Sequence, residues 1–199
     1  MTEGEVRAAL RRQLSAPRAA HSERVAEAAA DLAARHGQDA DAARLAGWLH
    51  DWYKEVPARE LVALARSCGV LPADARPEDV VTSVLHGPVA ARLLPRRWPE
   101  LPAAVLDAVD RHTTGDPAMT PLDCCLYVGD MIEPGHDWDG LEALRALAAR
   151  DLWAATLAGM DIGLRHLLER GRPVDLRTVA ARNAVLRRVR GAGAAGAAG

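Results

Sequence analysis

An imidazole and a carboxylate lie next to each other in the segment LAGWLHDWYKEVP, residues 45–57. His50 and Asp51 interrupt an otherwise apolar run, and a buried aspartate is unfavourable unless it is paired or binds a cation. If the segment is helical, Lys54 lies on the same face, one turn later. The pattern suggests two metal ligands and an ammonium group for an anionic substrate such as a phosphate. Taken alone, Lys54 is more typical of a surface lysine.

Further histidines and a second aspartate occupy apolar helix faces or helix ends. They are His21, His86, His112 and Asp130, whereas His136 lies in the loop after Pro134. A single histidine in such a place is more often a hydrogen-bonded core residue than a metal ligand. Together with His50 and Asp51, however, the set has one economical explanation, which is convergence on a metal ion. Imidazole and carboxylate suit iron, manganese, cobalt or zinc, and no cysteine lies in these segments to build a thiolate zinc site.

The composition predicts an all-α fold. Phe is absent, and Ala, Leu, Arg and Glu, which are strong helix formers, dominate the 199 residues. A net charge of −2 without a basic stripe argues against a nucleic-acid partner. Three cysteines without regular spacing indicate no disulfide framework, so we expect a reducing, cytoplasmic location. We expect no signal peptide and no membrane partner, because no apolar run approaches the roughly 20 residues of a membrane span.

Apolar periodicity and breaker residues predict a series of helices in one domain over residues 1–190. The expected helices are a first segment ended by Pro17, then residues 19–36, 40–54, 58–67, 78–94, 101–113, 120–133, 140–149, 151–170 and 177–190. Within residues 78–94 we expect a break at Gly87–Pro88. The Gly/Ala-rich residues 191–199 are expected to form a disordered tail.

The order His21, His50–Asp51, Asp130 resembles the H…HD…D pattern of the HD-domain phosphohydrolase superfamily. A bare His-Asp pair is weak evidence, but further stretches are similar, in the same order, to the YqeK family of symmetrical bis(5′-nucleosyl)-tetraphosphatases. They are HSERVAEAAADLAARHG, LAGWLHDWYKE, LHGPVAA, DRHTTGDPAMTPLD, YVGDMIEP and VDLRTVAARNAVL, and they span about residues 18–187. The resemblance implies an HD-domain helical bundle and the symmetrical hydrolysis of diadenosine tetraphosphate to two ADP.

The resemblance also implies a metal centre. The positions that match the family's metal ligands are His21, His50, Asp51 and Asp130. Iron is the usual metal of the family, with manganese or cobalt as alternatives. His86 and His112 match histidines that hold a second ion in two-metal HD proteins, so the resemblance leaves open whether one ion or two are bound.

Other matched positions line the nucleotide phosphates in the family. They are Lys54, His86, His112 and Thr113, with His136 at a further phosphate-contacting position. Lys54 would offset the charge that develops on the phosphoryl oxygens. Either Asp51 or Asp130 could orient the attacking water, and the sequence does not choose between them.

The chain departs from the family pattern A-D-x-I-E-P-x-R at two positions. Gly129 replaces the alanine, which we expect to matter little, and His136 replaces the arginine. Histidine is smaller than arginine and, with an ordinary pKa of about 6.5, is not permanently charged. The replacement therefore puts the affinity for substrate, or its pH dependence, in question. It leaves the metal ligands untouched.

The residues leave other functions open. The chain could be an HD phosphohydrolase for another nucleotide, or a metal-bound nucleotide sensor with little turnover, to which His136 gives some weight. A purely structural bundle would have to explain two aspartates and four histidines on apolar helix faces. We expect a dinucleoside polyphosphate or ADP as the small-molecule partner, and the sequence is also compatible with a homodimer.

Overall fold

The computed structural model describes residues 2–196, and within this range every regular element is helical. This confirms the predicted all-α fold. The α-helices are α1 (Glu3–Gln13), α2 (Ala16–Arg35), α3 (Ala40–Leu49), α4 (Ala58–Ser67), α5 (His86–Leu93), α6 (Ala103–Arg111), α7 (Pro121–Ile132), α8 (Leu141–Ala148), α9 (Leu152–Glu169) and α10 (Leu176–Gly196). Short 3-10 helices before and after α5 are η1 (Pro77–Asp79), η2 (Thr82–Val84) and η3 (Leu94–Arg96).

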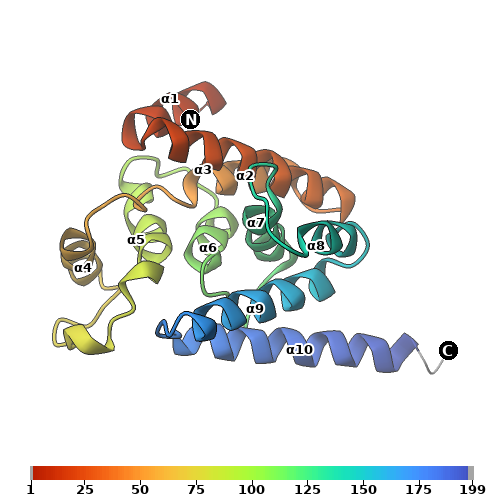
Figure 1. The fold of residues 1–199 in the computed structure, drawn as a ribbon. Coiled ribbons are helices and arrows are strands. Elements are labelled where there is room, and N and C mark those ends of the chain that lie inside the picture. The colour runs from red at the N-terminus through yellow and green to blue at the C-terminus, as the bar shows by residue number, and fades with distance from the viewer. Residues whose placement is uncertain (1, 197–199) are drawn as a thin grey trace.

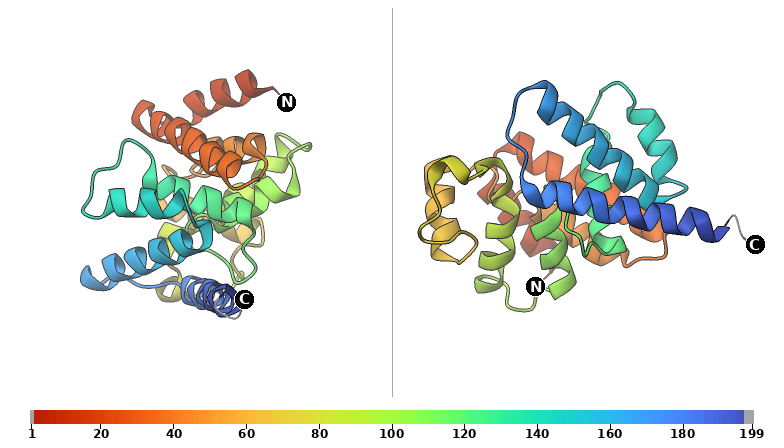
Figure 2. Two further views of the ribbon diagram at one scale, coloured as in Figure 1. Left: turned by 90° about the vertical axis from the view of Figure 1, so that its right-hand side faces the viewer. Right: turned by 90° about the horizontal axis from the view of Figure 1, so that it is seen from below.

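Helices α2, α3, α6 and α7 form the centre of the bundle (Figure 1). Helix α2 packs along both α3 and α7, and α6 packs against α3, α5 and α7. Helix α10 lies along α9 on the side opposite α1 and α2 (Figure 2). The main hydrophobic core runs through these central helices, and a smaller core joins α4 to α5. The centre of the bundle is therefore where side chains from several helices can meet.

Helix α2 begins where the sequence offers a capping residue and a proline. The Ser15 hydroxyl accepts a hydrogen bond from the backbone N–H of Arg18, and Pro17 lies in the first turn, where its missing N–H is not needed. Pro17 therefore belongs to the start of α2 and does not itself end the preceding helix, which ends at Gln13. The buried face of α2 is mostly alanine with Val25 and Leu32, so neighbouring helices can approach it closely.

The helix predicted over residues 40–54 ends early, at Leu49. Residues 50–55 continue as turns, with i to i+3 backbone hydrogen bonds such as Lys54 N–H to Asp51 C=O at 2.9 Å. Pro57 lacks an N–H and disfavours helical backbone in the residue before it, so an α-helix could not continue past this turn. Asp51 and Lys54 consequently lie on a tight turn, and the expectation that one helical face carries both was wrong.

The helix predicted over residues 78–94 is also shorter than expected. Residues before His86 form 3-10 turns, and α5 runs from His86 to Leu93. Gly87 and Pro88 were expected to break a helix, but they occupy its first turn, where a proline is well tolerated. His86 is therefore the first residue of α5, and its Nδ1 faces the carbonyl of Ser83, which precedes the helix.

At the C-terminal end, α10 continues to Gly196. Residues 191–196 are thus helical where disorder was expected, because alanine favours helix strongly enough to offset the interspersed glycines. Residues 197–199 lie outside the described residues. None of the helices in the described range is both long and apolar enough to cross a membrane.

Two glycines allow the central helices to approach each other at backbone distance. A Cβ added to Gly47 of α3 would lie 2.4 Å from Ala26 Cα of α2. A Cβ added to Gly129 of α7 would lie 2.9 Å from the backbone nitrogen of Ala29, which is also in α2. Both distances are too short for a methyl group, so the backbone itself would have to move. The expectation that Gly129 matters little was therefore wrong for this chain.

We predict that Gly129→Ala lowers the free energy of unfolding by about 1–3 kcal/mol, the usual cost of adding a methyl group to a tightly packed contact. Urea denaturation measures this change. Gly163→Ala is the matched control, because a Cβ at this helical glycine would meet only the Tyr127 hydroxyl, at 3.9 Å. The control should be neutral or stabilising, since alanine is the better helix former. Equal effects of the two substitutions would contradict a close α2–α7 contact.

Candidate metal centre

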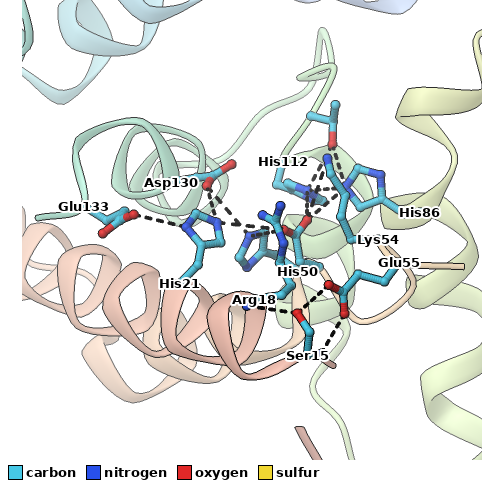
Figure 3. Close-up of polar contacts among 12 residues, drawn as sticks. Ser15, Arg18, His21, His50, Lys54, Glu55, His86, His112, Asp130 and Glu133 are labelled. Carbon is cyan, nitrogen blue, oxygen red and sulfur yellow. Dashed lines mark hydrogen bonds and ion pairs between the residues drawn. The ribbon is translucent and has the colours of Figure 1, made fainter. Parts of the chain in front are cut away.

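Four side chains from three helices and the turn after α3 gather at the centre of the bundle (Figure 3). His21 extends from α2, His50 ends α3, Asp51 follows it, and Asp130 extends from α7. His21 Nε2 lies 3.1 Å from Asp130 Oδ1 and 3.8 Å from Asp51 Oδ2. His50 Nε2 lies 3.5 Å from Asp51 Oδ2 and 3.8 Å from Asp130 Oδ1. The structure thus brings together the four residues that the sequence predicts as ligands.

The Asp51 carboxylate also faces a second pair of histidines. Its Oδ1 atom lies 3.2 Å from His86 Nε2 and 3.8 Å from His112 Nε2. The two Nε2 atoms are 2.9 Å apart, and the Thr113 hydroxyl lies 3.0 Å from His112 Nε2 and 3.3 Å from His86 Nε2. Asp51 therefore stands between two groups of imidazoles, with one carboxylate oxygen directed to each.

Backbone carbonyls set the orientation of three of these imidazoles. The Nδ1 atoms of His50, His86 and His112 lie 2.7, 3.1 and 2.7 Å from the carbonyl oxygens of the residues three positions earlier. A carbonyl oxygen only accepts, so each Nδ1 donates. Each Nε2 then faces the centre of the cluster. This arrangement leaves the nitrogen that binds metals free to do so.

Burial and opposite charges shift the pKa values of the cluster. Burial raises the pKa of Asp51, but His50, His112 and His86 outweigh burial and hold it well below its usual range. Burial likewise raises the pKa of Asp130, and the hydrogen bond from His21 and the charge of His50 lower it overall. Both carboxyl groups are therefore ionised at neutral pH and offer negative charge to a cation.

The histidines of the cluster differ from each other in charge. Burial alone would lower the pKa of His50, but the carboxylates of Asp51 and Asp130 raise it to about 9. Burial lowers the pKa of His86 to about 4, because its bond to Asp51 is offset by His112 and Lys54. His86 is therefore a neutral imidazole, whereas the pocket around His50 attracts positive charge.

One buried nitrogen indicates that this centre can hold a metal ion. His50 Nε2 has no hydrogen-bond partner in the part of the chain that the structure describes, although buried polar atoms are nearly always paired. Donor atoms of His21, His50 and Asp130 lie within 4.8 Å of one another, as do those of His50, Asp51 and His112. Imidazole nitrogens and carboxylate oxygens are ligands that first-row transition metals accept. The residues present therefore fit a metal.

Comparison with known proteins agrees with this geometry. Residues 18–135 match the HD domain. The symmetrical bis(5′-nucleosyl)-tetraphosphatase of Bacillus subtilis is 34% identical over 87% of this chain and 92% of its own length. The chain belongs to the HD domain family, among the symmetrical bis(5′-nucleosyl)-tetraphosphatases. A tetraphosphatase of the same name from Halalkalibacterium halodurans is 29% identical over 94% of this chain and 98% of its own length.

A solved structure supports the assignment at the level of the fold. A crystal structure from Clostridium acetobutylicum, described as a predicted HD superfamily hydrolase involved in NAD metabolism, superposes with a TM-score of 0.87. It is 30% identical and covers 94% of this chain and 98% of its own. The HD domain match includes every predicted metal ligand, and His136 lies one residue beyond it.

An open cavity of about 300 Å³ leads to the candidate metal centre of this HD domain. Its wall includes Arg18, Lys54, Met131, His136 and Trp138. The Lys54 ammonium lies 4.0 Å from Asp51 Oδ1, and His136 is 41% exposed with its ring 5.8 Å from that of His21. The cavity thus places one ammonium, one guanidinium and one imidazole around the entrance to the two aspartates.

Lys54 is distinctive in the sequence of this HD protein. It is the only lysine in the chain, whereas the other 24 basic residues are arginine. The turn that carries it is fixed to the start of α2, because both the backbone N–H and the hydroxyl of Ser15 donate to the Glu55 carboxylate, at 2.7 and 2.6 Å. All other basic side chains of this type are arginine, and two hydrogen bonds from Ser15 hold the turn in place. An incidental surface lysine is therefore a poor explanation for Lys54.

Sequence reasoning missed two charged residues at this centre. Arg18 Nη1 donates to Asp51 Oδ2 at 2.9 Å. The buried Glu133 carboxylate accepts from His21 Nδ1 at 3.1 Å. Helical spacing gave a signal for both, because Arg18 lies three residues before His21 and Glu133 three residues after Asp130. Arginine and glutamate are common on exposed helix faces, so the spacing alone did not separate them from surface residues.

We predict that Asp130→Asn weakens binding of Mn²⁺ or Co²⁺ by at least about tenfold, because the amide removes a negative charge from the donor set without changing its shape. Isothermal titration with the metal-free protein measures the affinity. Asp161→Asn is the control, because that carboxylate pairs with Arg182 between α9 and α10. Wild-type affinity in Asp130→Asn would contradict a metal centre at this position.

Proposed function

We propose that this HD protein is a metal-dependent hydrolase that cleaves diadenosine tetraphosphate symmetrically into two ADP. The names of its relatives support this substrate and product. The observation that carries the proposal is the buried Asp51 carboxylate, which faces His21 and His50 on one side and His86 and His112 on the other. The names of the relatives do not favour the alternatives, which are another nucleotide substrate or a sensor with little turnover.

We propose that His21, His50, Asp51 and Asp130 hold one metal ion. The resemblance to the family favours iron, and the donor set accepts manganese or cobalt as well. When bound, the ion acts as a Lewis acid, which lowers the pKa of water and offsets negative charge on a phosphate oxygen. In this proposal His86 and His112 contact the substrate and do not bind a second ion. Metal analysis should therefore give one ion per chain. Two ions, one of which is lost in His112→Ala, would contradict this part of the proposal.

The cationic residues of the cavity would bind the polyphosphate. Lys54 and Arg18 lie beside Asp51 at the cavity entrance, where they can offset charge on the phosphoryl oxygens and on the leaving ADP. His86, His112 and Thr113 form a compact group on the far side of the Asp51 carboxylate, where the Thr113 hydroxyl can donate to a phosphate. His136 lies at the entrance, where the family pattern that the sequence resembles has an arginine, and would bind phosphate more weakly than arginine.

Asp130 is better suited than Asp51 to orient the attacking water. The Asp51 side chain is only 4% exposed, and its two oxygens already face Arg18 and His86. The Asp130 side chain is 31% exposed and lines the cavity. A general base must reach the water from which it takes a proton. We therefore assign the orientation of the water to Asp130. Asp51 would supply the buried negative charge that holds the metal ion.

A purified, metal-loaded protein should convert diadenosine tetraphosphate into ADP as the only nucleotide product. Separation of the products by anion-exchange chromatography measures this. EDTA should abolish turnover, and Fe²⁺, Mn²⁺ or Co²⁺ should restore it. Formation of AMP and ATP in equal amounts would contradict symmetrical cleavage. Tight ADP binding without any product would support the sensor instead.

Lys54→Arg should lower kcat/KM by about a hundredfold, although the positive charge is kept. An ammonium is a compact point charge, whereas a guanidinium is planar and larger and cannot occupy the same place beside Asp51. Lys54→Gln should cost at least as much. Steady-state kinetics measure both, with metal content determined in parallel to show that the centre itself is intact. Unchanged kcat/KM in both variants would exclude Lys54 as a substrate contact.

A further inference from the structure

Glu133 occupies a costly position for a carboxylate. It is only 1% exposed and follows the last residue of α7. Burial disfavours its charge, and the carbonyl end of a helix disfavours negative charge further. Two backbone carbonyls at this helix end, those of Ile132 and Glu133, already accept hydrogen bonds from Arg145. Arg145 therefore satisfies carbonyls at the end of α7, and the buried position of the carboxylate requires a further explanation.

Four donors surround the Glu133 carboxylate. Arg24 donates through Nε to Oε2 at 2.5 Å and through Nη2 to Oε1 at 3.1 Å, which is a two-pronged pair. The backbone N–H of Gly135 donates to Oε2 at 2.5 Å. His21 Nδ1 lies 3.1 Å from Oε1. Burial raises the pKa of Glu133, but these bonds lower it to about 2, so the group is an ionised acceptor.

The bond to His21 differs from those that orient the other histidines of the centre. His50, His86 and His112 lie at helix ends, where the carbonyl three residues earlier is free to accept from Nδ1. His21 lies inside α2, where the backbone carbonyls are used by the helix itself. An interior histidine needs an acceptor from elsewhere in the fold, and α7 supplies one through Glu133.

The geometry determines which nitrogen of His21 is free. Figure 3 shows Glu133 on one side of the His21 ring and Asp130 with His50 on the other. Both nitrogens lie 3.1 Å from a carboxylate oxygen, but Glu133 lies outside the proposed ligand set and only accepts, so with a metal on the Nε2 side His21 Nδ1 carries the hydrogen. Nε2, which lies 3.1 Å from Asp130 Oδ1, then offers its lone pair to the metal centre.

We propose that Glu133 is a positioning residue, which fixes the tautomer and ring orientation of His21 for metal binding and is itself held in place by Arg24. This inference rests on the proposed metal centre and deepens it. A residue that orients a metal-binding histidine typically contributes about 10- to 100-fold to metal affinity. Glu133 would thus tie the strength of metal binding to the contact between α2 and the end of α7.

A cation site at Glu133 itself does not fit the same contacts. His21, Glu133 and His136 place donor atoms within 4.8 Å of one another. However, the Arg24 guanidinium already pairs with both carboxylate oxygens, and its charge would repel a metal ion. Nδ1 of His21 also faces the carboxylate with its hydrogen. The three residues therefore do not form a cation site of their own.

The first test uses the wild-type chain loaded with Zn²⁺, a diamagnetic ion that imidazole and carboxylate donors accept. Nitrogen NMR of the ¹⁵N-histidine-labelled protein distinguishes a hydrogen on Nδ1 from one on Nε2. We expect His21, identified by its loss in His21→Gln, to carry its hydrogen on Nδ1. A hydrogen on Nε2 would overturn the proposal, and this result does not depend on the folding of a Glu133 variant.

The second test compares Glu133→Gln with Arg145→Gln in titrations with Mn²⁺ or Co²⁺. The amide of Gln cannot accept at both ends, so either His21 or Arg24 loses its partner, and metal affinity should fall about 10- to 100-fold with mixed His21 tautomers. Arg145 holds the same segment only through the Ile132 and Glu133 carbonyls. Arg145→Gln should therefore lower stability and leave metal affinity unchanged.

Two outcomes separate this inference from the proposed function. Wild-type metal affinity and a single His21 tautomer in folded Glu133→Gln would overturn the positioning role, even if the wild-type chain hydrolyses diadenosine tetraphosphate. Equal loss of affinity in Arg145→Gln would overturn it too, because the loss would then report on the segment and not on the carboxylate. Conversely, failure of the wild-type chain to hydrolyse the dinucleotide would leave the metal and NMR measurements to decide the role of Glu133.

Discussion

The buried carboxylate of Asp51 is the constraint on which the structure of this HD domain depends. It is 3% exposed, and an isolated ion at that depth would destabilise the fold. His50 is its neighbour in sequence, whereas Arg18, His86 and His112 reach it from α2, α5 and the end of α6. Each of these helices must therefore end or turn so that a polar group points inward. The fold and the centre are specified by the same requirement.

Small residues make this convergence possible. Aspartate and histidine side chains are short, so the helices that carry them must approach closely. Gly47 and Gly129 let α3 and α7 contact the backbone of α2, and a Cβ at Gly87 would lie 2.6 Å from Val109 C=O and 3.0 Å from the His112 ring. A larger residue at any of these positions would separate the groups that share Asp51. Glycine thus sets the distances at which the polar atoms interact.

The fold class and the convergence of the histidines could be predicted because both leave local signals. Helix formers dominate the chain, and His50 with Asp51 interrupts an apolar run. The turn at Asp51 and Lys54 could not be separated from a continued helix by spacing alone, since i+3 neighbours are close in both. Arg18 and Glu133 were missed for a different reason. Their partners are distant in sequence, and only the packing of α2 against α3 and α7 brings them together.

The histidine at position 136 is best understood together with Arg18. The family pattern that this sequence resembles has an arginine at the position of His136, where this chain has a ring whose Nε2 lies 3.7 Å from Glu133 Oε1. An arginine there would compete with Arg24 for the same carboxylate, which already pairs with one guanidinium. Arg18 brings a permanent positive charge to the same cavity from α2. The cavity therefore has a guanidinium beside Asp51 without an arginine at position 136. The Glu133 carboxylate accepts hydrogen bonds from Arg24 and His21 without a competing guanidinium.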